Sequence, residues 1–319
     1  MLFNPARLGL WTARRLPTVA KPFLWAWGQY YGYTRGSKIH WLFTAMGNEM
    51  NYRIPFTVTL PNGRKLTVPV NDTTGQAIIQ HGYTEAESVA LVTSLVRDGS
   101  VFFDLGAHAG QFTLVAAGLV GANGQVHSFE PDPETFLWLC RNVNQNRLSN
   151  VTLNQAAASD REGHQEFHLG TVETLAASSL RRPRHPSGRT VMIATTSIDS
   201  YCAARGIHRI DFMKIDVEGA EIDVLNGARS LLLGKHKPIL HIEFHPYTQK
   251  AFGRSLPQLA DALRGLGYAL FRITRSGPMD FWLDEEEQQP FNVLAMDRER
   301  ASVFRDTALA DSESRPSIA

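Results

Sequence analysis

The chain has 319 residues, long enough for one large α/β domain or two small ones with a sizeable buried core. Its formal net charge of +1 gives no overall positive field, which argues against a nucleic-acid partner. The two cysteines, Cys140 and Cys202, are too few for a disulfide framework or a zinc knuckle. The sequence shows neither an uncharged apolar run of about 18 residues nor a signal-peptide pattern, so we expect a cytoplasmic protein.

Residues 1–50 form a basic arm that is rich in aromatic side chains. Six Arg and Lys residues face a single acid, Glu49, and the same stretch holds ten aromatic residues. This composition suits a helical arm packed on the main domain or on a second subunit. It also suits peripheral contact with a membrane, where indole rings lie at headgroup depth and cations meet anionic lipids. Both readings stay open.

Residues 51–80 are predicted to add a β-hairpin extension. Ile54–Leu60 and Lys65–Val70 are rich in β-forming residues, and Pro61-Asn62-Gly63 between them supplies a turn. A helical spacing of apolar residues follows over Glu85–Arg97, where Asp98-Gly99 ends it.

Strands and helices alternate through most of residues 81–300, which we assign to one domain. This rhythm predicts a seven-stranded, mostly parallel sheet with helices on both faces. The expected strands are Val101–Leu105, Gly124–Phe129, Asn150–Ala156, Ile210–Ile215, Pro238–Phe244, Tyr268–Thr274 and Phe291–Met296. Two segments depart from the rhythm: a basic, proline-broken loop at Ser178–Arg189, and a polar tail at 301–319 that we expect to be disordered.

A glycine motif follows the first predicted strand of this sheet. Asp104, Gly106 and Gly110 form an Asp-x-Gly-x-x-x-Gly pattern before a helix, which permits a tight turn and close approach of a ligand. The carboxylate of Asp104 would repel a pyrophosphate, which argues against an NAD-linked oxidoreductase, but it would attract a cation such as S-adenosylmethionine. Glu130 ends the second strand, where an acid accepts hydrogen bonds from ribose hydroxyls.

Four motifs together resemble the FkbM family of S-adenosylmethionine-dependent methyltransferases. They are D-L-G-A-H-A-G (104–110), F-E-P-D-P (129–133), M-K-I-D-V-E-G-A-E (213–221) and I-E-F-H-P (242–246). The resemblance spans roughly residues 81 to 275 and implies a Rossmann-like class I methyltransferase fold. It also implies S-adenosyl-L-methionine as cofactor and O-methylation of a hydroxyl on a sugar, glycan or other natural product; N- or C-methylation stays an alternative.

The resemblance also implies roles for particular residues. The implied cofactor contacts are the loop at Asp104, Gly106, Ala107 and Gly110, the ribose-binding turn at Glu130 and Pro131, Asn142 and Ala157 near the adenine, and Asp216 of the acidic strand end, which Glu218 also matches. His108 stands where the family usually has Asn, and we expect it to contact the cofactor through its backbone.

The candidates for a catalytic base lie at the ends of the fourth and fifth predicted strands. Removal of a proton from an alcohol by a positioned base typically adds about 10² to 10⁴ in rate. The candidates are Asp216, Glu218, Glu243 and His245, with Asp216 the first choice. His241, Glu243 and His245 would share one face of an extended strand. Glu221 is interpreted as an acid that stabilises a helix start.

Three alternatives accompany this interpretation. Asp216, Glu243 and His245 offer ligands to Mg²⁺ or Mn²⁺, although the resemblance requires no metal. The chain could be a non-catalytic S-adenosylmethionine-binding module, but its strand-end acids are intact. The basic loop suggests an anionic acceptor, since guanidinium groups clamp phosphates and carboxylates; the residues concerned are Arg181, Arg182, Arg184 and Arg189.

Overall fold

A computed structural model describes residues 54–70, 72–170, 178–181, 186–284 and 286–313 of the chain. The basic arm predicted for residues 1–50, together with Arg182 and Arg184, lies outside the described residues. No helix in these ranges is both long enough and apolar enough to cross a membrane.

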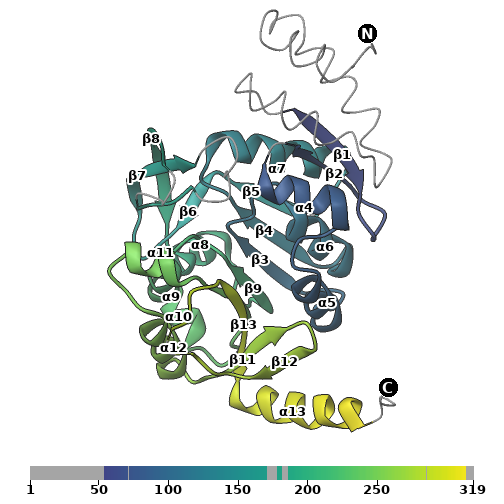
Figure 1. The fold of residues 1–319 in the computed structure, drawn as a ribbon, viewed down its shortest axis with the longest axis vertical. Helices are drawn as coiled ribbons and strands as arrows, with labels where there is room; N and C mark the ends of the chain where they lie inside the picture. Colours follow the sequence, from purple (N-terminus) through teal and green to yellow (C-terminus); the bar gives the residue numbers. More distant parts are fainter. Residues whose placement is uncertain (1–53, 71, 171–177, 182–185, 285, 314–319) are drawn as a thin grey trace, which may run out of the picture.

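The centre of the molecule is an eight-stranded sheet in the order β12-β11-β13-β10-β9-β3-β4-β5 (Figure 1). Five neighbouring strands run parallel: β5 (Val151–Asn154), β4 (Gln125–Phe129), β3 (Val101–Leu105), β9 (Phe212–Ile215) and β10 (Ile239–Phe244). The remaining strands, β13 (Phe291–Asp297), β11 (Tyr268–Thr274) and β12 (Gly277–Asp280), pair antiparallel. The fold class is confirmed, each of the seven predicted strands matches a strand of this sheet, one of them only in part, and β12 extends the sheet by one edge strand.

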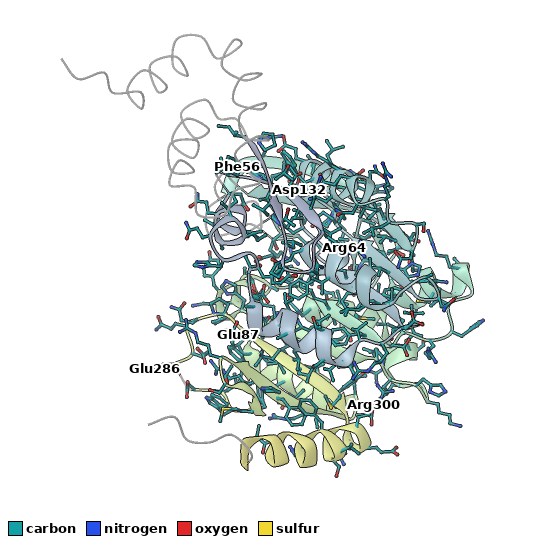
Figure 2. The ribbon with its side chains drawn as sticks, turned by 90° about the vertical axis from the view of Figure 1, so that its right-hand side faces the viewer. Phe56, Arg64, Glu87, Asp132, Glu286 and Arg300 are labelled. Atoms are coloured by element: carbon teal, nitrogen blue, oxygen red, sulfur yellow. The ribbon has the colours of Figure 1, made fainter. Side chains whose placement is uncertain are left out.

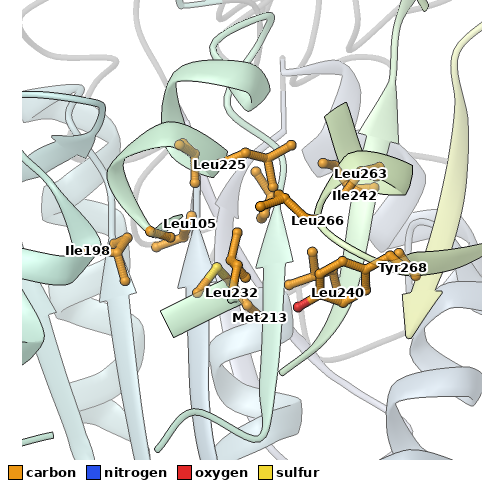
Figure 3. Packing of buried hydrophobic residues seen from close by; sticks show 14 of the residues in the cluster. Leu105, Ile198, Met213, Leu225, Leu232, Leu240, Ile242, Leu263, Leu266 and Tyr268 are labelled. Carbon is orange, nitrogen blue, oxygen red and sulfur yellow. The ribbon is translucent and has the colours of Figure 1, made fainter. Parts of the chain in front are cut away.

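Helices cover both faces of this sheet, as predicted. One face packs against α8 (Ile198–Arg205), α9 (Glu221–Gly227), α10 (Arg229–Leu232) and α12 (Leu256–Gly265). Figure 3 shows this layer, with Leu105, Met213 and Leu240 of the sheet beneath Leu225 and Leu263 of the helices. The other face carries α5 (Ala86–Leu95), α6 (Gln111–Leu119) and α7 (Pro133–Gln145).

The hairpin of β1 (Pro55–Thr59) and β2 (Lys65–Pro69) packs as a separate unit on one end of the domain, with α4 (Thr73–His81) beside it. Figure 2 shows Phe56 of β1 and Asp132 at the start of α7 toward this end, and Arg300 toward the other. The apolar side chains of the hairpin and α4 pack on Ala109 and Leu114, so the hairpin supports the loop and helix that follow β3. The sequence analysis did not anticipate α4.

A second sheet of three strands, in the order β6-β8-β7, corrects the prediction for the middle of the chain. Its strands are β6 (Ala156–Ala158), β7 (Gly163–Gly170) and β8 (Pro186–Thr196). The strand predicted at Asn150–Ala156 is divided, because its last residue belongs to β6 and pairs with β8. The predicted basic loop is also partly wrong, since residues 186–189 belong to β8.

The predicted disorder from about Ala301 is wrong as far as Glu313. Residues Arg298–Glu313 form helix α13, which lies beneath β11 and β13 in Figure 1. Ala301 is 1% exposed, and the ring of Phe304 lies 5.3 Å from that of Phe271. These few apolar contacts within a polar segment anchor the helix to the sheet.

Candidate active site

A cavity opens beyond the carboxyl ends of β3, β4 and β9, where doubly wound sheets bind their ligands. Seven of the predicted site residues line it, namely Gly106, His108, Glu130, Pro131, Ala157, Asp216 and Glu218. Apolar side chains complete the lining, among them Phe129, Phe167 and Leu180. Six predicted residues are absent from the lining: Asp104, Ala107, Gly110, Asn142, Glu243 and His245.

The loop after β3 is held in a shape that only glycine permits at two positions. Gly106 has φ +78°, and a Cβ there would lie 1.8 Å from the carbonyl oxygen of Asp216. Gly110 has φ +95°, and its Cβ would lie 2.7 Å from Leu139 Cδ1. The N–H groups of Gly106 and Ala107 both donate to the carbonyl of Phe129, at 3.0 and 2.9 Å. These contacts draw the loop against the ends of β4 and β9.

Glu130 is a buried carboxylate that organises the wall of the cavity. Its Oε2 accepts a hydrogen bond from the N–H of His108 at 2.8 Å, and its Oε1 accepts one from the N–H of Asp132 at 2.9 Å. Burial raises the pKa of Glu130 to about 8, although these two N–H groups favour the anion. The backbone N–H of His108 is therefore bonded to Glu130, and a contact between the His108 backbone and the cofactor stays a prediction.

Asn142 supports the cavity from behind and is absent from its lining, so the place near the adenine that the resemblance implied for it stays a prediction. Its side-chain amide is completely buried. Nδ2 donates to the carbonyls of Thr67 at 2.8 Å and Ala109 at 2.7 Å, while Oδ1 accepts from the N–H of Thr67 at 2.7 Å. Asn142 thus ties the hairpin to the glycine loop.

Asp104 also lies behind the lining. Its Oδ2 accepts a 2.6 Å hydrogen bond from Thr113 Oγ1, while its Oδ1 is buried without a partner among the described residues. The side chain is completely buried, and this burial raises its pKa.

Strand register brings the polar residues of the site into two rows on the face toward α5 and α6. In the first row Lys214 of β9 pairs with Asp104 of β3 on one side and His241 of β10 on the other. In the second row Glu243 pairs with Asn292 of β13. Ile215 and Ile242 are paired, and Asp216 and Glu243 each follow one of them. Asp216 and Glu243 are therefore neighbours at the carboxyl ends of the adjacent strands β9 and β10. Leu240, Ile242 and Phe244 are buried on the opposite face of β10. Because side chains alternate along a strand, the prediction that His241 and Glu243 lie on one face is confirmed.

Asp216 is held by an ion pair at the end of β9. Lys214 Nζ lies 2.9 Å from Asp216 Oδ2, and the lysine side chain is only 4% exposed. Burial opposes ionisation of Asp216, but the Lys214 ammonium outweighs it and lowers the pKa of the carboxyl. The same pairing, with a further contribution from Asp104, raises the pKa of Lys214 against the effect of burial. Asp216 is therefore an anion, and a weaker base than an ordinary aspartate.

Glu218 and Glu243 lie close to this anion. Asp216, Glu218 and Glu243 each offer one carboxylate oxygen, and these oxygens all lie within 4.8 Å of one another. Burial, followed by repulsion from Asp216, raises the pKa of both glutamates well above the usual range. Glu243 Oε2 is buried without a hydrogen-bond partner among the described residues, whereas Asp216 has Lys214.

Glu221 makes more specific contacts than the helix-stabilising role that we predicted for it would require. Its Oε1 accepts from the N–H groups of Val217 at 3.2 Å and Gly219 at 3.1 Å, and Gln249 Nε2 donates to Oε2. The side chain is 1% exposed, and burial raises its pKa to about 7. Glu221 thus fixes the turn that carries Glu218, at the residue where α9 begins.

The two histidines of β10 and its end differ in their surroundings. His241 is 1% exposed, and its Nε2 lies 2.8 Å from Ser88 Oγ of α5. Burial lowers its pKa to about 3, so it is neutral. His245 caps α11 (Pro246–Ala251), where its Nδ1 accepts from the N–H of Tyr247 at 3.3 Å. Burial also lowers the pKa of His245.

Strained backbone is concentrated around this site. Four described residues other than glycine have a positive φ, and three of them, Glu85 (50°), His108 (50°) and Glu218 (55°), lie in or next to the site. Such conformations cost roughly 1 to 3 kcal/mol each and cluster at functional sites. Glu85 precedes α5 and accepts a 2.6 Å hydrogen bond from Asn292, which places a further exposed carboxylate beside the second row.

Four residues that were not predicted from the sequence complete the polar rows, namely Glu85, Ser88, Lys214 and Asn292. Lys214 stands inside a motif that we quoted, but it was not among the predicted site residues. Its ion-pair partner Asp216 is two residues away, but its neighbours Asp104 and His241 belong to β3 and β10, and only the strand register brings them beside it. Glu85 and Asn292 are 207 residues apart.

Of the basic loop, Arg181 and Arg189 are described and exposed. Arg181 lines a second cavity of about 350 Å³ together with Arg161, Phe252 and Arg254. Its guanidinium lies 5.6 Å from the centre of the Phe252 ring. Leu180 lines both cavities, but none of Asp216, Glu218 and Glu243 lines the second.

The first cavity fits S-adenosylmethionine. Its lining, made entirely of described residues, combines carboxylates with apolar side chains and includes no Lys or Arg. That set suits a ligand with an apolar ring, a ribose and a positive charge, and it is unsuited to a pyrophosphate. The sheet order, the glycine loop after β3 and the acid after β4 define a class I S-adenosylmethionine-dependent methyltransferase.

Sequence comparisons identify the family. Residues 104–270 match the model of the methyltransferase FkbM domain, and the chain belongs to this family. The 2-O-methyltransferase NoeI of Sinorhizobium fredii is 28% identical over 155 residues, which cover 44% of this chain and 63% of NoeI. The 31-O-demethyl-FK506 methyltransferase FkbM of Streptomyces tacrolimicus is 30% identical over 200 residues, which cover 54% of this chain and 75% of that protein.

Among solved structures, the methyltransferase FkbM from Methylobacillus flagellatus KT is similar with a TM-score of 0.41 and 19% identity. The match covers 66% of this chain and 47% of that one. The chain therefore spans less than two thirds of the length of the Methylobacillus protein and of NoeI. The family assignment rests on the sequence matches.

Proposed function

We propose that the protein transfers a methyl group from S-adenosylmethionine to a hydroxyl group of a sugar, glycan or related natural product. The observation that carries this proposal is a pair of neighbouring acids, of which one lines the cofactor cavity. Asp216 is ionised and lines the cavity, while Glu243 lies beside Asp216 with a raised pKa and with a carboxylate oxygen that has no hydrogen-bond partner among the described residues. The names of NoeI and of the FK506 methyltransferase, both O-methylating enzymes, support a hydroxyl acceptor.

The division of labour between these acids follows from their electrostatics. When bound, S-adenosylmethionine supplies a methyl group that is already activated by the sulfonium. Asp216, stabilised as an anion by Lys214, provides negative charge at the cavity wall for the positive end of the cofactor. In its ionised form, Glu243 takes the proton of the acceptor hydroxyl, since the ionised form of a carboxyl with a raised pKa is a stronger base than an ordinary carboxylate. We therefore propose Glu243 for the role that the sequence favoured for Asp216.

The direct test has two arms. Isothermal titration with S-adenosylhomocysteine measures cofactor binding, and a labelled-methyl screen over sugars, glycans and polyketide alcohols measures transfer. We expect binding together with label in at least one hydroxyl product that resists mild base, as ethers do. Binding without transfer to any acceptor class would favour the non-catalytic module, and label in an amine would exclude O-methylation.

An anionic group on the acceptor is a further part of the proposal, and among the described residues it is supported by Arg181. This side chain is exposed in the second cavity and has no ion-pair partner in the described part of the chain, whereas Arg161 and Arg254 pair with Asp160 and Asp223. Arg181→Gln should raise KM for a carboxylate- or phosphate-bearing acceptor and leave KM for its neutral analogue unchanged. An equal KM for both acceptors in the variant and the wild type would contradict this part.

A metal-assisted reaction is the second candidate, favoured by the three carboxylate oxygens of Asp216, Glu218 and Glu243 within 4.8 Å of one another. Carboxylates are the ligands that Mg²⁺ and Mn²⁺ prefer, and such an ion would orient a diol acceptor. His245, which the sequence analysis placed in this set, is not part of the group. Loss of transfer in EDTA with recovery on adding Mg²⁺ or Mn²⁺ would support the metal, and full activity in EDTA would exclude it.

A further inference from the structure

The second cavity brings three guanidinium groups together. Its volume is about 350 Å³, and the arginines in its lining are Arg161, Arg181 and Arg254. Like charges that share a cavity repel one another unless anions lie between them. The partners of each guanidinium therefore indicate which ligand the cavity can bind.

Carboxylates of the chain pair with two of these three arginines. Asp160 Oδ1 lies 2.7 Å from Arg161 Nε, and Asp223 Oδ1 accepts a hydrogen bond from Arg254 Nη2. Arg181 is exposed and forms no ion pair with another described residue. All the side-chain donors of Arg181 are thus left for a ligand by the described part of the chain.

Arg254 also has a hydrogen-bond donor that no described residue satisfies. Its Nη1 is buried and has no partner among these residues, although its Nη2 donates to Asp223. Buried polar groups are nearly always hydrogen-bonded, so this donor marks a place for an oxygen that the described residues do not supply. The guanidinium carbons of Arg181 and Arg254 each lie 5.6 Å from the centre of the Phe252 ring. The spare donors of two arginines therefore lie around one aromatic ring.

The second cavity adjoins the first. Leu180 lines both of them. Phe252 packs on the turn after β9, since a Cβ at Gly219 would lie 2.7 Å from Phe252 Cδ2. Gly219 follows Glu218, which lines the first cavity. A group bound beside Phe252 therefore lies next to the turn that carries Glu218.

We propose that the second cavity is a subsite for a phosphate group of the acceptor, held between Arg181 and Arg254. This narrows the anionic group of the acceptor to a phosphate and adds Arg254 to its site. A carboxylate has two oxygens, which the N–H groups of one guanidinium can satisfy, whereas a phosphate group has three free oxygens and can accept from two guanidiniums on separate segments. Among the described acids of the lining, Glu166 alone has no arginine partner, but it is exposed, so solvent weakens its repulsion of an anion. The link to the acceptor rests on the proposed function, whereas phosphate binding can be measured without methyl transfer.

The experiment follows the binding of inorganic phosphate by phosphorus-31 NMR, with and without saturating S-adenosylhomocysteine, while chloride holds the ionic strength constant. We expect saturable binding to the wild type that S-adenosylhomocysteine does not displace, because the described lining of the first cavity contains no Lys or Arg. Arg254→Lys keeps a positive charge beside Asp223 but lacks the guanidinium fork, so binding should weaken by about tenfold or more. Arg181→Gln should also weaken it, and acetate should bind the wild type more weakly than phosphate does.

Arg272→Lys is the matched control. Like Arg254, Arg272 pairs with a carboxylate, that of Glu287 at 2.7 Å, and lies beside an aromatic ring, that of Phe291 at 3.8 Å. Arg272 lines neither cavity, so Arg272→Lys should bind phosphate as the wild type does. If Arg254→Lys does not fold, Arg181→Gln decides the question, because this side chain is exposed.

The outcomes separate this proposal from the proposed function. The absence of saturable phosphate binding, equal binding by the wild type and the cavity variants, or displacement of phosphate by S-adenosylhomocysteine would overturn the subsite and leave the proposed function intact. Acetate that binds as tightly as phosphate would overturn the choice of phosphate. A wild type that binds phosphate but no S-adenosylhomocysteine would overturn the proposed function, and the link to the acceptor with it.

The link to the acceptor has its own test in the transfer reaction. With the acceptor found by the labelled-methyl screen, inorganic phosphate should inhibit transfer in competition with the acceptor and not with S-adenosylmethionine. Transfer that is unaffected by phosphate at concentrations that fill the subsite would overturn the link.

Discussion

Gly106 and Asp216 approach each other so closely that the carbonyl oxygen of Asp216 occupies the place of a side chain at position 106. A Cβ at Gly106 would lie 1.8 Å from that oxygen. The glycine loop and the acidic strand end are therefore one rigid wall of the cavity, although 110 positions separate these two residues in the chain.

The first prediction is that Gly106→Ala displaces this wall. The methyl group has to push the backbone of β9 away, and we expect a loss of about 1 to 3 kcal/mol in stability and no measurable binding of S-adenosylhomocysteine. Gly63→Ala is the matched control, because Gly63 has a similar φ (81° against 78°) but no atom within 4 Å of its Cβ position. Thermal unfolding and titration calorimetry of both variants measure the difference. Equal binding by the two variants would contradict the prediction.

The second prediction concerns Asn142, which never touches the cavity. Asn142→Ala leaves the carbonyls of Thr67 and Ala109 without their donor, so the hairpin and the glycine loop separate. We expect a stability loss of roughly 1 to 3 kcal/mol for each unsatisfied buried group, together with weaker S-adenosylhomocysteine binding. Asn150→Ala is the control, since Asn150 also donates to two carbonyls, those of Ala117 and Gly121, but away from the loop. Unchanged affinity in folded Asn142→Ala would show that the hairpin does not support the loop.

The third prediction separates the two acids of the reaction. Glu243→Gln should lower kcat by about 10² to 10⁴ and leave the affinity for S-adenosylhomocysteine unchanged, because it removes a base without changing the cavity lining. Asp216→Asn should weaken cofactor binding as well. Glu299→Gln, on the exposed side of α13, controls for the loss of a surface charge. Steady-state kinetics on the acceptor found by the labelled-methyl screen provide the measurement, and a Glu243→Gln enzyme with wild-type kcat would remove Glu243 from the role of base.

The fourth prediction is a dependence of stability on pH. The pKa of Glu221 in the folded chain is about 7, above its ordinary value of 4.5, so the folded state holds a proton that the unfolded chain has lost. The stability that this proton contributes is complete below about pH 4.5 and is lost as the pH rises through 7, a decrease of about 3 kcal/mol. Burial also raises the pKa of Glu130, to about 8, so its titration lowers the stability further as the pH rises.

The measurement is denaturant unfolding of the wild type and Glu221→Gln at about pH 5 and about pH 8. The variant should lose less stability between the two pH values than the wild type does, since the amide that replaces the Glu221 carboxyl does not titrate. Glu299→Gln should reproduce the wild-type difference. A wild type that is more stable at the higher pH would show that other groups outweigh Glu221 and Glu130.

Much of the fold could be read from the sequence because the parallel strands are short apolar runs bounded by turns and helices. The three-stranded sheet was missed since β8 follows a segment with several prolines and arginines, which looked like a loop. Helix α13 was missed for a related reason: its described contacts depend on Ala301 and Phe304 within polar sequence. Composition describes the average of such a segment, whereas a few apolar side chains determine where it packs.

The candidate site was only partly predictable. A period of two places Glu243 on one face of its strand, and strand ends locate Asp216 and Glu218, so these acids could be named from the sequence. The different charge states of these acids could not be predicted from the sequence. They depend on the ion pair with Lys214 and on repulsion between carboxylates, and both follow from the register of separate strands. Asn142 is a comparable case, since its bonds to Thr67 and Ala109 join segments that are 75 and 33 residues away.

The sheet order has a practical consequence for anyone who trims this protein. The family match ends at residue 270, but β13 (Phe291–Asp297) lies between β10 and β11 and pairs with both. A polypeptide limited to residues 104–270 would lack β13, so no strand would join β10 to β11. The hydrophobic clusters on the two faces of the sheet would also lose Val293, Leu294 and Ala295. Such a polypeptide would also lack the hairpin that packs under the glycine loop. The segment that identifies the family by sequence is therefore smaller than the piece of chain that builds the complete sheet and the hairpin that packs on it.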